Sequence, residues 1–291
     1  MENPTAIICL TVAVLLGNVG LSWSADLQKV LEAAERRNAR AQFNLGEIYE
    51  KGQGVLKNNE TAVKWYRLAA KQGLADAQNN LGFMYTHGLG VPWDRKIALT
   101  WYRLGAEQGD ARAQFNLGEM HLKGRGVPQS YESALKWWRS SAEQGYARAQ
   151  FNLGVMYEYG HGISRDYEAA LKWYRFAAEQ GYAESQFSLG WMYRKGKGVP
   201  QDDKTALKWY RLAAEQGYAK SQFNLGVMYY TGSGVGQSDV YAYMWGTIAA
   251  SNGSRYGDDV QNHVAKRLTK AQLGKAHKLA DECIRKKYRG C

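Results

Sequence analysis

Apolar and polar positions recur along most of the chain with a period of 36 residues. The stretch AQFNLGEIYEKGQGV at residues 41–55 returns two and three periods later as AQFNLGEMHLKGRGV and AQFNLGVMYEYGHGI. A fixed period of this length is typical of repeat proteins. The pattern predicts six repeats over residues 38–253, which are 38–73, 74–109, 110–145, 146–181, 182–217 and 218–253.

Each repeat is predicted to contain two helices joined by short turns. In the first half, apolar residues three or four positions apart, such as Ala41, Leu45 and Tyr49, define one helical stripe. This stripe ends at Gly52, which suits a left-handed C-cap, and the second helix is expected to end at Gly73. The second helix begins after a column of good N-cap residues. That column contains Asn58, Asp94, Ser130, Asp166, Asp202 and Ser238.

A glycine column lies inside the first helices, where each glycine costs about 1 kcal/mol relative to alanine. Its members are Gly46, Gly82, Gly118, Gly154, Gly190 and Gly226. A cost repeated in every unit indicates a close approach of another helix, and the small Ala62 and Ala69 columns are the expected partners. The column that begins at Trp65 is expected to fill the space towards the neighbouring repeat.

Both ends of the array depart from the repeat pattern, as capping helices require. Residues 25–37 resemble half a repeat but place Lys29 where the tryptophan column would fall. Residues 254–291 follow the sixth repeat and contain a capping box at Thr269. The prediction is an all-α solenoid of six helix-turn-helix repeats with a helical cap at each end.

The repeated motif AQFNLGxMYxxGxGV, followed by AxxWYxxAAEQG, resembles the Sel-1-like repeat (SLR) family, which is related to the tetratricopeptide repeat. The resemblance covers residues 38–253 fully and the caps loosely. It implies a right-handed αα-superhelix that acts as a scaffold or adaptor and binds a protein or peptide partner in its concave groove. A cysteine-rich branch has been linked to β-lactam or peptidoglycan-fragment binding, but its per-repeat cysteines are missing here. A peptidoglycan-fragment binder, or a weak β-lactamase-like hydrolase of the envelope, is the alternative function.

The first 24 residues have the features of a secretory signal peptide. TAIICLTVAVLL is an apolar run too short to span a bilayer, and Ser22 and Ser24 are the small residues before a cleavage site at Ala25. The segment before the run carries no lysine or arginine, so an uncleaved N-terminal anchor is the alternative. Because many bacterial members of the family are exported, the segment predicts a periplasmic or secreted protein of the bacterial envelope.

The chain is basic, with 38 Lys and Arg against 27 Asp and Glu, and much of the excess lies near the C-terminus. Residues 254–291 hold ten basic and four acidic side chains. This segment suits peripheral contact with an anionic membrane or an acidic glycan, and a solvated helix face is the alternative. No nucleic-acid-binding motif is present in the sequence, so nucleic acid is not expected as a partner.

Two cysteines remain beyond the predicted signal segment, Cys283 and Cys291. In an oxidising compartment they form a disulfide that closes a short loop, or they stay as two unpaired thiols. The sequence leaves both states open.

Catalytic templates are not found in the sequence. It contains no GxSxG, no HExxH, no SxxK with plausible partners and no GxxxxGK[ST] phosphate loop. The five histidines share no repeat column and form no i, i+4 pair, so no metal ion is expected. The chain is therefore predicted to be a binding protein without enzymatic activity and without a cofactor.

An asparagine column is the strongest candidate for peptide contact. Because an amide donates and accepts at once, a row of asparagines along a groove can hold an extended peptide backbone. The alternative is that each amide bonds the loop backbone of its own repeat. A neighbouring column varies from Glu47 to Phe83 and Trp191, as a specific groove requires. The asparagine column contains Asn44, Asn80, Asn116, Asn152 and Asn224, with Ser188 as its one substitution.

An arginine column on the second helices is expected to be a solvated face. Four of its members have a glutamate four residues further on, so exposed ion pairs are expected to neutralise much of it. The column contains Arg67, Arg103, Arg139, Arg175 and Arg211.

Overall fold

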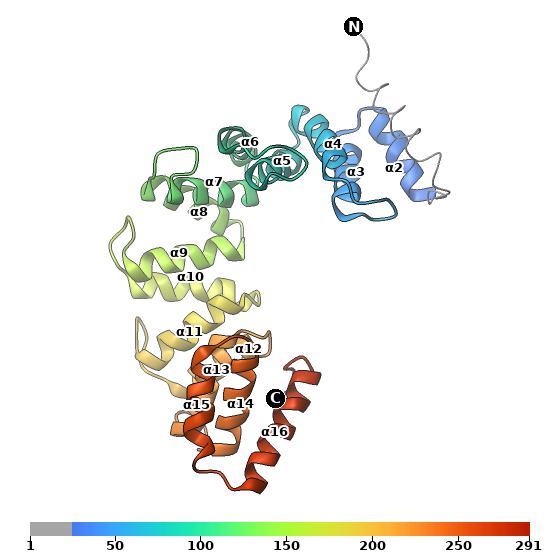
Figure 1. Cartoon of the computed structure of the whole chain (residues 1–291). Helices are drawn as coiled ribbons and strands as arrows, with labels where there is room; N and C mark the ends of the chain where they lie inside the picture. Colours follow the sequence, from blue (N-terminus) through green and yellow to red (C-terminus); the bar gives the residue numbers. More distant parts are fainter. Residues whose placement is uncertain (1–24) are drawn as a thin grey trace. The chain divides into compact units, whose positions relative to one another are not determined.

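The computed structural model describes residues 25–291, so the predicted signal segment at residues 1–24 lies outside the described part. In the described part, the chain forms fifteen α-helices and no strand (Figure 1). None of these helices combines the length and the apolar composition needed to cross a membrane. The chain forms two compact units, and the boundary between them in the sequence falls after Ser141.

Unit 1 begins with a capping helix and continues with helix pairs. Its helices are α2 (Ala25–Glu35), α3 (Ala39–Lys51), α4 (Asn59–Lys71), α5 (Ala75–His87), α6 (Arg95–Glu107), α7 (Ala111–Lys123) and most of α8 (Tyr131–Glu143). Unit 2 contains α9 (Ala147–Tyr159), α10 (Tyr167–Glu179), α11 (Ala183–Lys195), α12 (Asp203–Ala214), α13 (Ala219–Thr231), α14 (Asp239–Ser251), α15 (Arg255–Ala265) and α16 (Lys270–Arg285).

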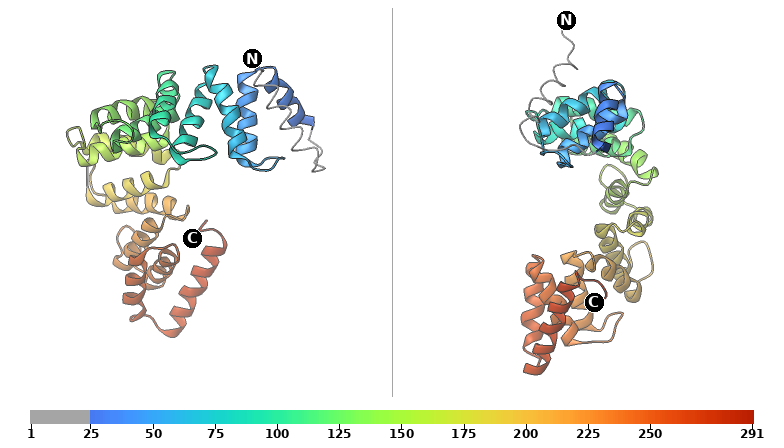
Figure 2. Two further views of the ribbon diagram at one scale, coloured as in Figure 1. Left: turned by 45° about the horizontal axis from the view of Figure 1, so that its top comes forward. Right: turned by 90° about the vertical axis from the view of Figure 1, so that its right-hand side faces the viewer.

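The two helices of a repeat pack against each other as a hairpin. In unit 1, α3 packs against α4 and α5 against α6; in unit 2 the pairs are α9 with α10, α11 with α12 and α13 with α14 (Figures 1 and 2). Within each unit, the second helix of a repeat also packs against the first helix of the next, as α4 does against α5. The predicted all-α solenoid is confirmed.

Local capping explains where the helices begin and end. Gly52 has φ = 71° and donates its backbone N–H to the carbonyl of Ile48, so it closes α3 as predicted. The second helix ends one residue earlier than expected, because Gln72 is the C-cap of α4 and Gly73 follows it with φ = 87°. The whole N-cap column is confirmed: each side chain accepts from a backbone N–H two or three residues later, in Asn58, Asp94, Ser130, Asp166, Asp202 and Ser238.

In the first five repeats the glycine column accommodates aromatic rings, so the expected alanine partners are wrong there. A Cβ atom on Gly154 would lie 2.5 Å from Cδ1 of the buried Tyr174, which is closer than real Cβ contacts. In the sixth repeat the ring itself is replaced by Gly246. There a Cβ on Gly226 would lie 3.3 Å from the carbonyl oxygen of Ala242, which belongs to the expected Ala62 column. In the first five repeats the glycine and ring pairs are Gly46–Tyr66, Gly82–Tyr102, Gly118–Trp138, Gly154–Tyr174 and Gly190–Tyr210.

A buried glutamine ladder connects consecutive helix pairs within each unit. Each glutamine donates from Nε2 to an alanine carbonyl at 3.0–3.2 Å. In most repeats its Oε1 atom also accepts from a side-chain amide at the end of the second helix, as Gln186 does from Gln216 at 2.8 Å. The sequence marks this column only by its period and does not predict the bonds. The donor–acceptor pairs are Gln42–Ala34, Gln78–Ala70 and Gln114–Ala106 in unit 1, and Gln150–Ala142, Gln186–Ala178 and Gln222–Ala214 in unit 2.

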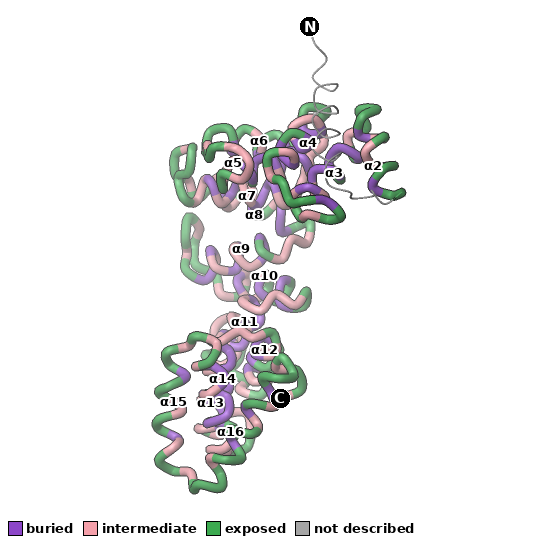
Figure 3. Tube along the Cα trace, turned by 45° about the vertical axis from the view of Figure 1, so that its right-hand side comes forward, coloured by how far each residue is buried: buried purple, intermediate pink, exposed green. Residues whose placement is uncertain are grey.

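The C-terminal cap is a divergent helix pair that covers the sixth repeat. Both α15 and α16 pack against α14, and Thr269 starts α16 with the predicted capping box to Gln272. Buried and exposed residues alternate along the helices, while most turn residues are exposed (Figure 3). The described helices thus leave their outward faces available for contact with other molecules.

Candidate protein-binding face

The first helix of each repeat turns one polar or mixed face outward, which we call the first-helix face. It consists of the four columns that begin at Arg40, Asn44, Glu47 and Lys51, spaced so that they follow one side of a helix. Every member of these columns is exposed or half-buried, whereas the Leu45 column beside them is buried in all six repeats. These outward columns are therefore the positions at which the repeats can differ without disturbing the core.

In unit 1 the first-helix face is charged and internally paired. The carboxylate of Asp76 on α5 accepts from Arg40 on α3 at 2.5 Å and from Arg112 on α7 at 2.6 Å. One acidic side chain therefore connects three consecutive first helices. Two further ion pairs on the same face join residues four apart, Glu47–Lys51 and Glu119–Lys123.

In unit 2 one of these four columns is apolar. Val155, Trp191 and Val227 occupy the column that holds two glutamates in unit 1, and all three are half-buried. Trp191 packs against the core clusters on both sides of it, and Tyr159 is 62% exposed. Alongside this column, three phenylalanine–tyrosine contacts link successive repeats with ring centroids 5.5–5.8 Å apart: Phe151–Tyr182, Phe187–Tyr218 and Phe223–Tyr256.

The asparagine column lies on the first-helix face, and several of its amides already bond within the fold. Asn116 donates to the side chain of Asn79 in the preceding repeat at 2.9 Å, and Asn79 donates to Asn80 at 3.2 Å. Asn224 donates to a carbonyl of its own helix at 2.8 Å and accepts from Arg194 of the preceding repeat at 3.1 Å. These bonds go to helices and side chains and not to loop backbone. Contact of this column with a peptide stays a prediction.

Four of the five arginines of the arginine column are exposed, as the predicted solvated face requires, but three members connect repeats in place of the expected ion pairs. Arg67, Arg175 and Arg211 each donate to a tyrosine hydroxyl on the first helix of the next repeat, at 2.8–3.1 Å. In the described chain, no ion pair joins Arg103, Arg175 or Arg211 to the glutamate four residues further on. A hydroxyl on a neighbouring helix is a better-placed acceptor than a carboxylate that is free to point into water. The bonded tyrosines are Tyr85, Tyr193 and Tyr229.

His121 stands in this tyrosine column, and we expect it to make unit 1 sensitive to acid. Burial and the nearby Arg103 guanidinium lower the pKa of His121 below its usual value of 6.5. The unfolded chain then takes up a proton more readily than the folded chain, so stability is lost as the pH falls below about 6.5. We expect His121→Tyr, which restores the column residue, to remove this loss.

Thermal unfolding followed by circular dichroism at about pH 7.5 and about pH 5 checks this expectation. The difference in Tm between His121→Tyr and wild type should grow at the lower pH. The control is His121→Phe, which removes the imidazole without restoring the hydroxyl and should lose the same pH dependence. A wild-type protein that loses no more stability in acid than His121→Tyr would contradict the assignment.

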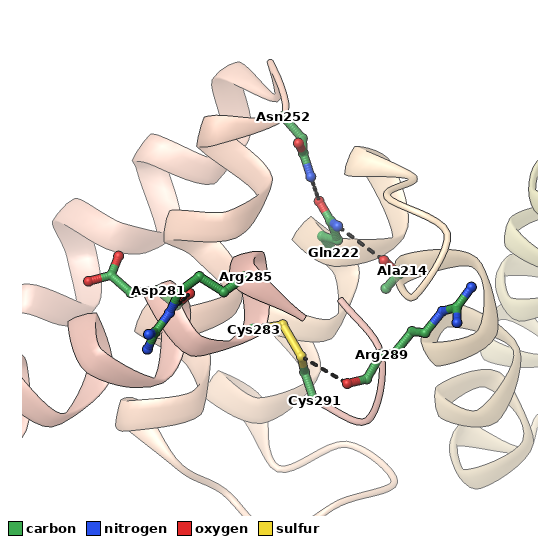
Figure 4. The surroundings of a disulfide bond; sticks show 8 residues. All are labelled: Ala214, Gln222, Asn252, Asp281, Cys283, Arg285, Arg289 and Cys291. Carbon is green, nitrogen blue, oxygen red and sulfur yellow. Dashed lines mark hydrogen bonds between the residues drawn. A yellow bond between two sulfur atoms is a disulfide. The ribbon is translucent and has the colours of Figure 1, made fainter. Parts of the chain in front are cut away.

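The structure also bears on the metal ligands and the two cysteines considered from the sequence. Within residues 25–291, no three His, Cys, Asp or Glu side chains are grouped as metal ligands would be. Cys283 on α16 and Cys291 form a disulfide, with their Cα atoms 5.7 Å apart (Figure 4). Of the two states that the sequence leaves open, the structure has the paired one.

Comparison with known proteins points to one repeat family. The family model described as Sel1 repeat matches residues 39–74, 75–110, 111–146, 147–182, 183–218 and 219–254. The crystal structure of a Sel1 repeat protein from Oxalobacter formigenes is 32% identical, with a TM-score of 0.70 over 85% of this chain and 97% of that chain. The protein c5321, described as a protective antigen present in uropathogenic Escherichia coli strains displaying an SLR fold, is 30% identical, with a TM-score of 0.55 over 98% of this chain and 77% of that chain. No curated protein matches the chain.

Proposed function

Because the chain belongs to the Sel1 repeat family, we propose that it is an exported scaffold that binds a protein or peptide partner on its first-helix face. Sel1 repeat proteins are generally protein-interaction scaffolds without catalytic activity. The observation that carries the proposal is the division of each first helix into a constant buried side and an outward side on which three of the four columns vary. A scaffold needs the buried side for its fold and the outward side for its specificity.

Unit 2 is the better part of this face for a partner. In unit 1 the charged side chains neutralise one another, so a partner would have to break existing ion pairs. In unit 2, Val155, Trp191 and Val227 offer a partly exposed apolar column, and Lys195 and Lys220 at its edges are exposed. An apolar centre with a polar rim is typical of protein-binding surfaces. The expected partner segment therefore has apolar side chains along its contact side.

The asparagines contribute to this proposal through the bonding capacity that they have left. An asparagine side chain has two donor hydrogens and two acceptor lone pairs. Asn224 uses one donor and one lone pair within the fold, so one of each is free for a peptide backbone.

Export is part of the same proposal. The apolar segment at residues 1–24 supports it, and so does the disulfide, since disulfides persist in oxidising compartments.

A capture experiment with matched variants tests the place of binding. Wild type and the double variant Val155→Lys, Val227→Lys are immobilised and exposed to envelope extract at about 0.15 M salt. The control is Phe83→Lys, which places the same side chain in the same column of unit 1. We expect a partner protein that wild type and the control retain and that the double variant loses by about tenfold or more. Equal retention by all three proteins, after circular dichroism shows that each is folded, would remove the first-helix face of unit 2 from the proposal.

A further inference from the structure

The residues after α16 fold back on the helix bundle as a loop, residues 286–291, which we call the hook. The Cys283–Cys291 disulfide closes it, and the backbone N–H of Tyr288 donates to the carbonyl of Cys283 at 2.8 Å. The Tyr288 hydroxyl donates to Oδ1 of Asn252 at 2.9 Å, which attaches the hook to the turn after α14. The hook is thus held at its last residue by the disulfide and at its centre by the hydrogen bonds of Tyr288.

The backbone of the hook adopts a conformation that needs these attachments. Lys287 and Tyr288 have φ values of 51° and 67°, in the left-handed region. That region is unfavourable for a residue with a side chain, because its Cβ comes too close to the following carbonyl oxygen. Two such residues in succession persist only where the surroundings hold them, and the disulfide supplies the covalent part of that restraint. We therefore expect the hook to open when the disulfide is reduced.

The hook forms one wall of a cleft, which we call the hook cleft. Its volume is about 730 Å³, within the range of sites that hold a small molecule or a few peptide residues. The opposite wall is the end of α12, where Leu212 is 37% exposed. In Figure 4 the side chain of Arg289 extends away from the disulfide and from α16. The lining residues are Gln186, Leu212, Glu215, Gln216, Lys287, Tyr288 and Arg289.

The charge of the hook cleft favours an acidic ligand. Lys287 and Arg289 line it, and Arg285 and Lys286 lie next to them in the chain. All four are exposed, and no ion pair in the described part of the chain involves any of them. Glu215 is the one acid among the lining residues, so the lining has a net positive charge. The apolar surface comes from Leu212 and the ring of Tyr288.

We propose that the hook cleft is a docking site for an acidic segment of a partner protein, and that it exists only while Cys283 and Cys291 are paired. The carboxylates of the segment meet Lys287 and Arg289, and an apolar side chain between them lies against Leu212. An acidic peptide fits these walls better than a membrane does, because the cleft is bounded on two sides by helices and loop. The site shares no residue with the first-helix face, so either proposal can fail without the other.

The test is fluorescence anisotropy with a labelled peptide in which one leucine is flanked on both sides by glutamates. A second peptide has glutamine in place of every glutamate. We expect the full-length oxidised protein to bind the glutamate peptide at least about tenfold more tightly than the glutamine peptide at low salt, and the difference to shrink as salt is added. The double variant Lys287→Glu, Arg289→Glu should weaken binding about tenfold or more.

Two further variants are needed. One distinguishes binding in the hook cleft from a general effect of net charge, and the other tests the role of the disulfide. Lys275→Glu, Lys278→Glu makes the same change of charge at exposed positions of α16 outside the cleft and should weaken binding less than about threefold, as a screened effect at a distance. Cys283→Ser, Cys291→Ser should weaken binding about tenfold while leaving the helix content unchanged. The proposal is overturned if the two charge variants lose affinity equally, if the cysteine variant binds as wild type does, or if anionic lipid vesicles bind and the glutamate peptide does not.

Discussion

Replacing Trp65 with alanine is expected to lower the unfolding free energy of the first repeat by about 3–5 kcal/mol, the range measured for buried large aromatics. Trp65 is only 1% exposed and packs in the core cluster formed by α2 to α5. Its removal leaves a large cavity in a stack where each helix pair touches only its neighbours, so no distant element can compensate. Hydrogen exchange of the amides in α3 and α4 measures this local loss.

Trp93→Ala is the matched control for this prediction. Trp93 lies in the turn before α6, is 65% exposed and contacts the Arg95 guanidinium at 5.3 Å from its ring centroid. Its loss should change stability by less than about 1 kcal/mol, as for an exposed cation–π contact. If Trp65→Ala and Trp93→Ala lower the protection of the α3 and α4 amides from exchange equally, the tryptophan column does not hold the repeats together in the way described.

The second large effect is expected from Gly154→Ala, which should destabilise unit 2 by about 1–3 kcal/mol. Alanine is the better helix former by about 1 kcal/mol. The sign of the measured change therefore shows whether this gain in helix propensity or the clash with the Tyr174 ring is larger. The added Cβ would lie 2.5 Å from the Tyr174 ring, which is fully buried and bonded through its hydroxyl to Glu158 at 2.5 Å. Moving the ring away from the new Cβ would therefore disturb its buried packing and its bond to Glu158.

Two further variants test this explanation by urea unfolding. Gly274→Ala in α16 has no atom within 4 Å of the new Cβ and should stabilise the protein by about 0.5–1 kcal/mol. In a Tyr174→Ala background, Gly154→Ala should be neutral or stabilising, because the ring that it would strike is gone. Destabilisation by Gly154→Ala that persists in the Tyr174→Ala background would contradict the ring contact.

Helices and turns are predictable from this sequence because their causes are local. The left-handed glycine after α3 and the N-cap oxygen of Asn58 act within a few residues of their own positions, and sixfold recurrence makes each signal clear. Partners across helices are harder to predict. The sequence gives the columns of glycine and of small alanine residues, but the rotation of each helix about its axis decides that Gly46 faces Tyr66 and not Ala62.

The same limit applies to the candidate sites. The glutamine ladder was not predicted because its acceptors are backbone carbonyls of another helix, which no side-chain pattern marks. The first-helix face was predicted in outline, since the variable column that includes Trp191 is visible in the sequence. Its ion pairs in unit 1 depend on which side chains meet across repeats, such as Arg40 and Asp76. The hook cleft could not be predicted, because predicting it requires the path of residues 286–291. That path depends on whether Cys283 and Cys291 are paired, which the sequence leaves open.

Site-specific photocrosslinking tests the central claim most directly. Benzoylphenylalanine is placed at Val227 on the first-helix face of unit 2 or at Lys208, an exposed position on the second helix α12. Both proteins are irradiated in envelope extract, and the adducts are identified by mass spectrometry. A scaffold that binds through its first helices should give a defined protein adduct from position 227 and none of that protein from position 208. The same adduct from both positions, or from position 208 alone, would show that the partner binds elsewhere.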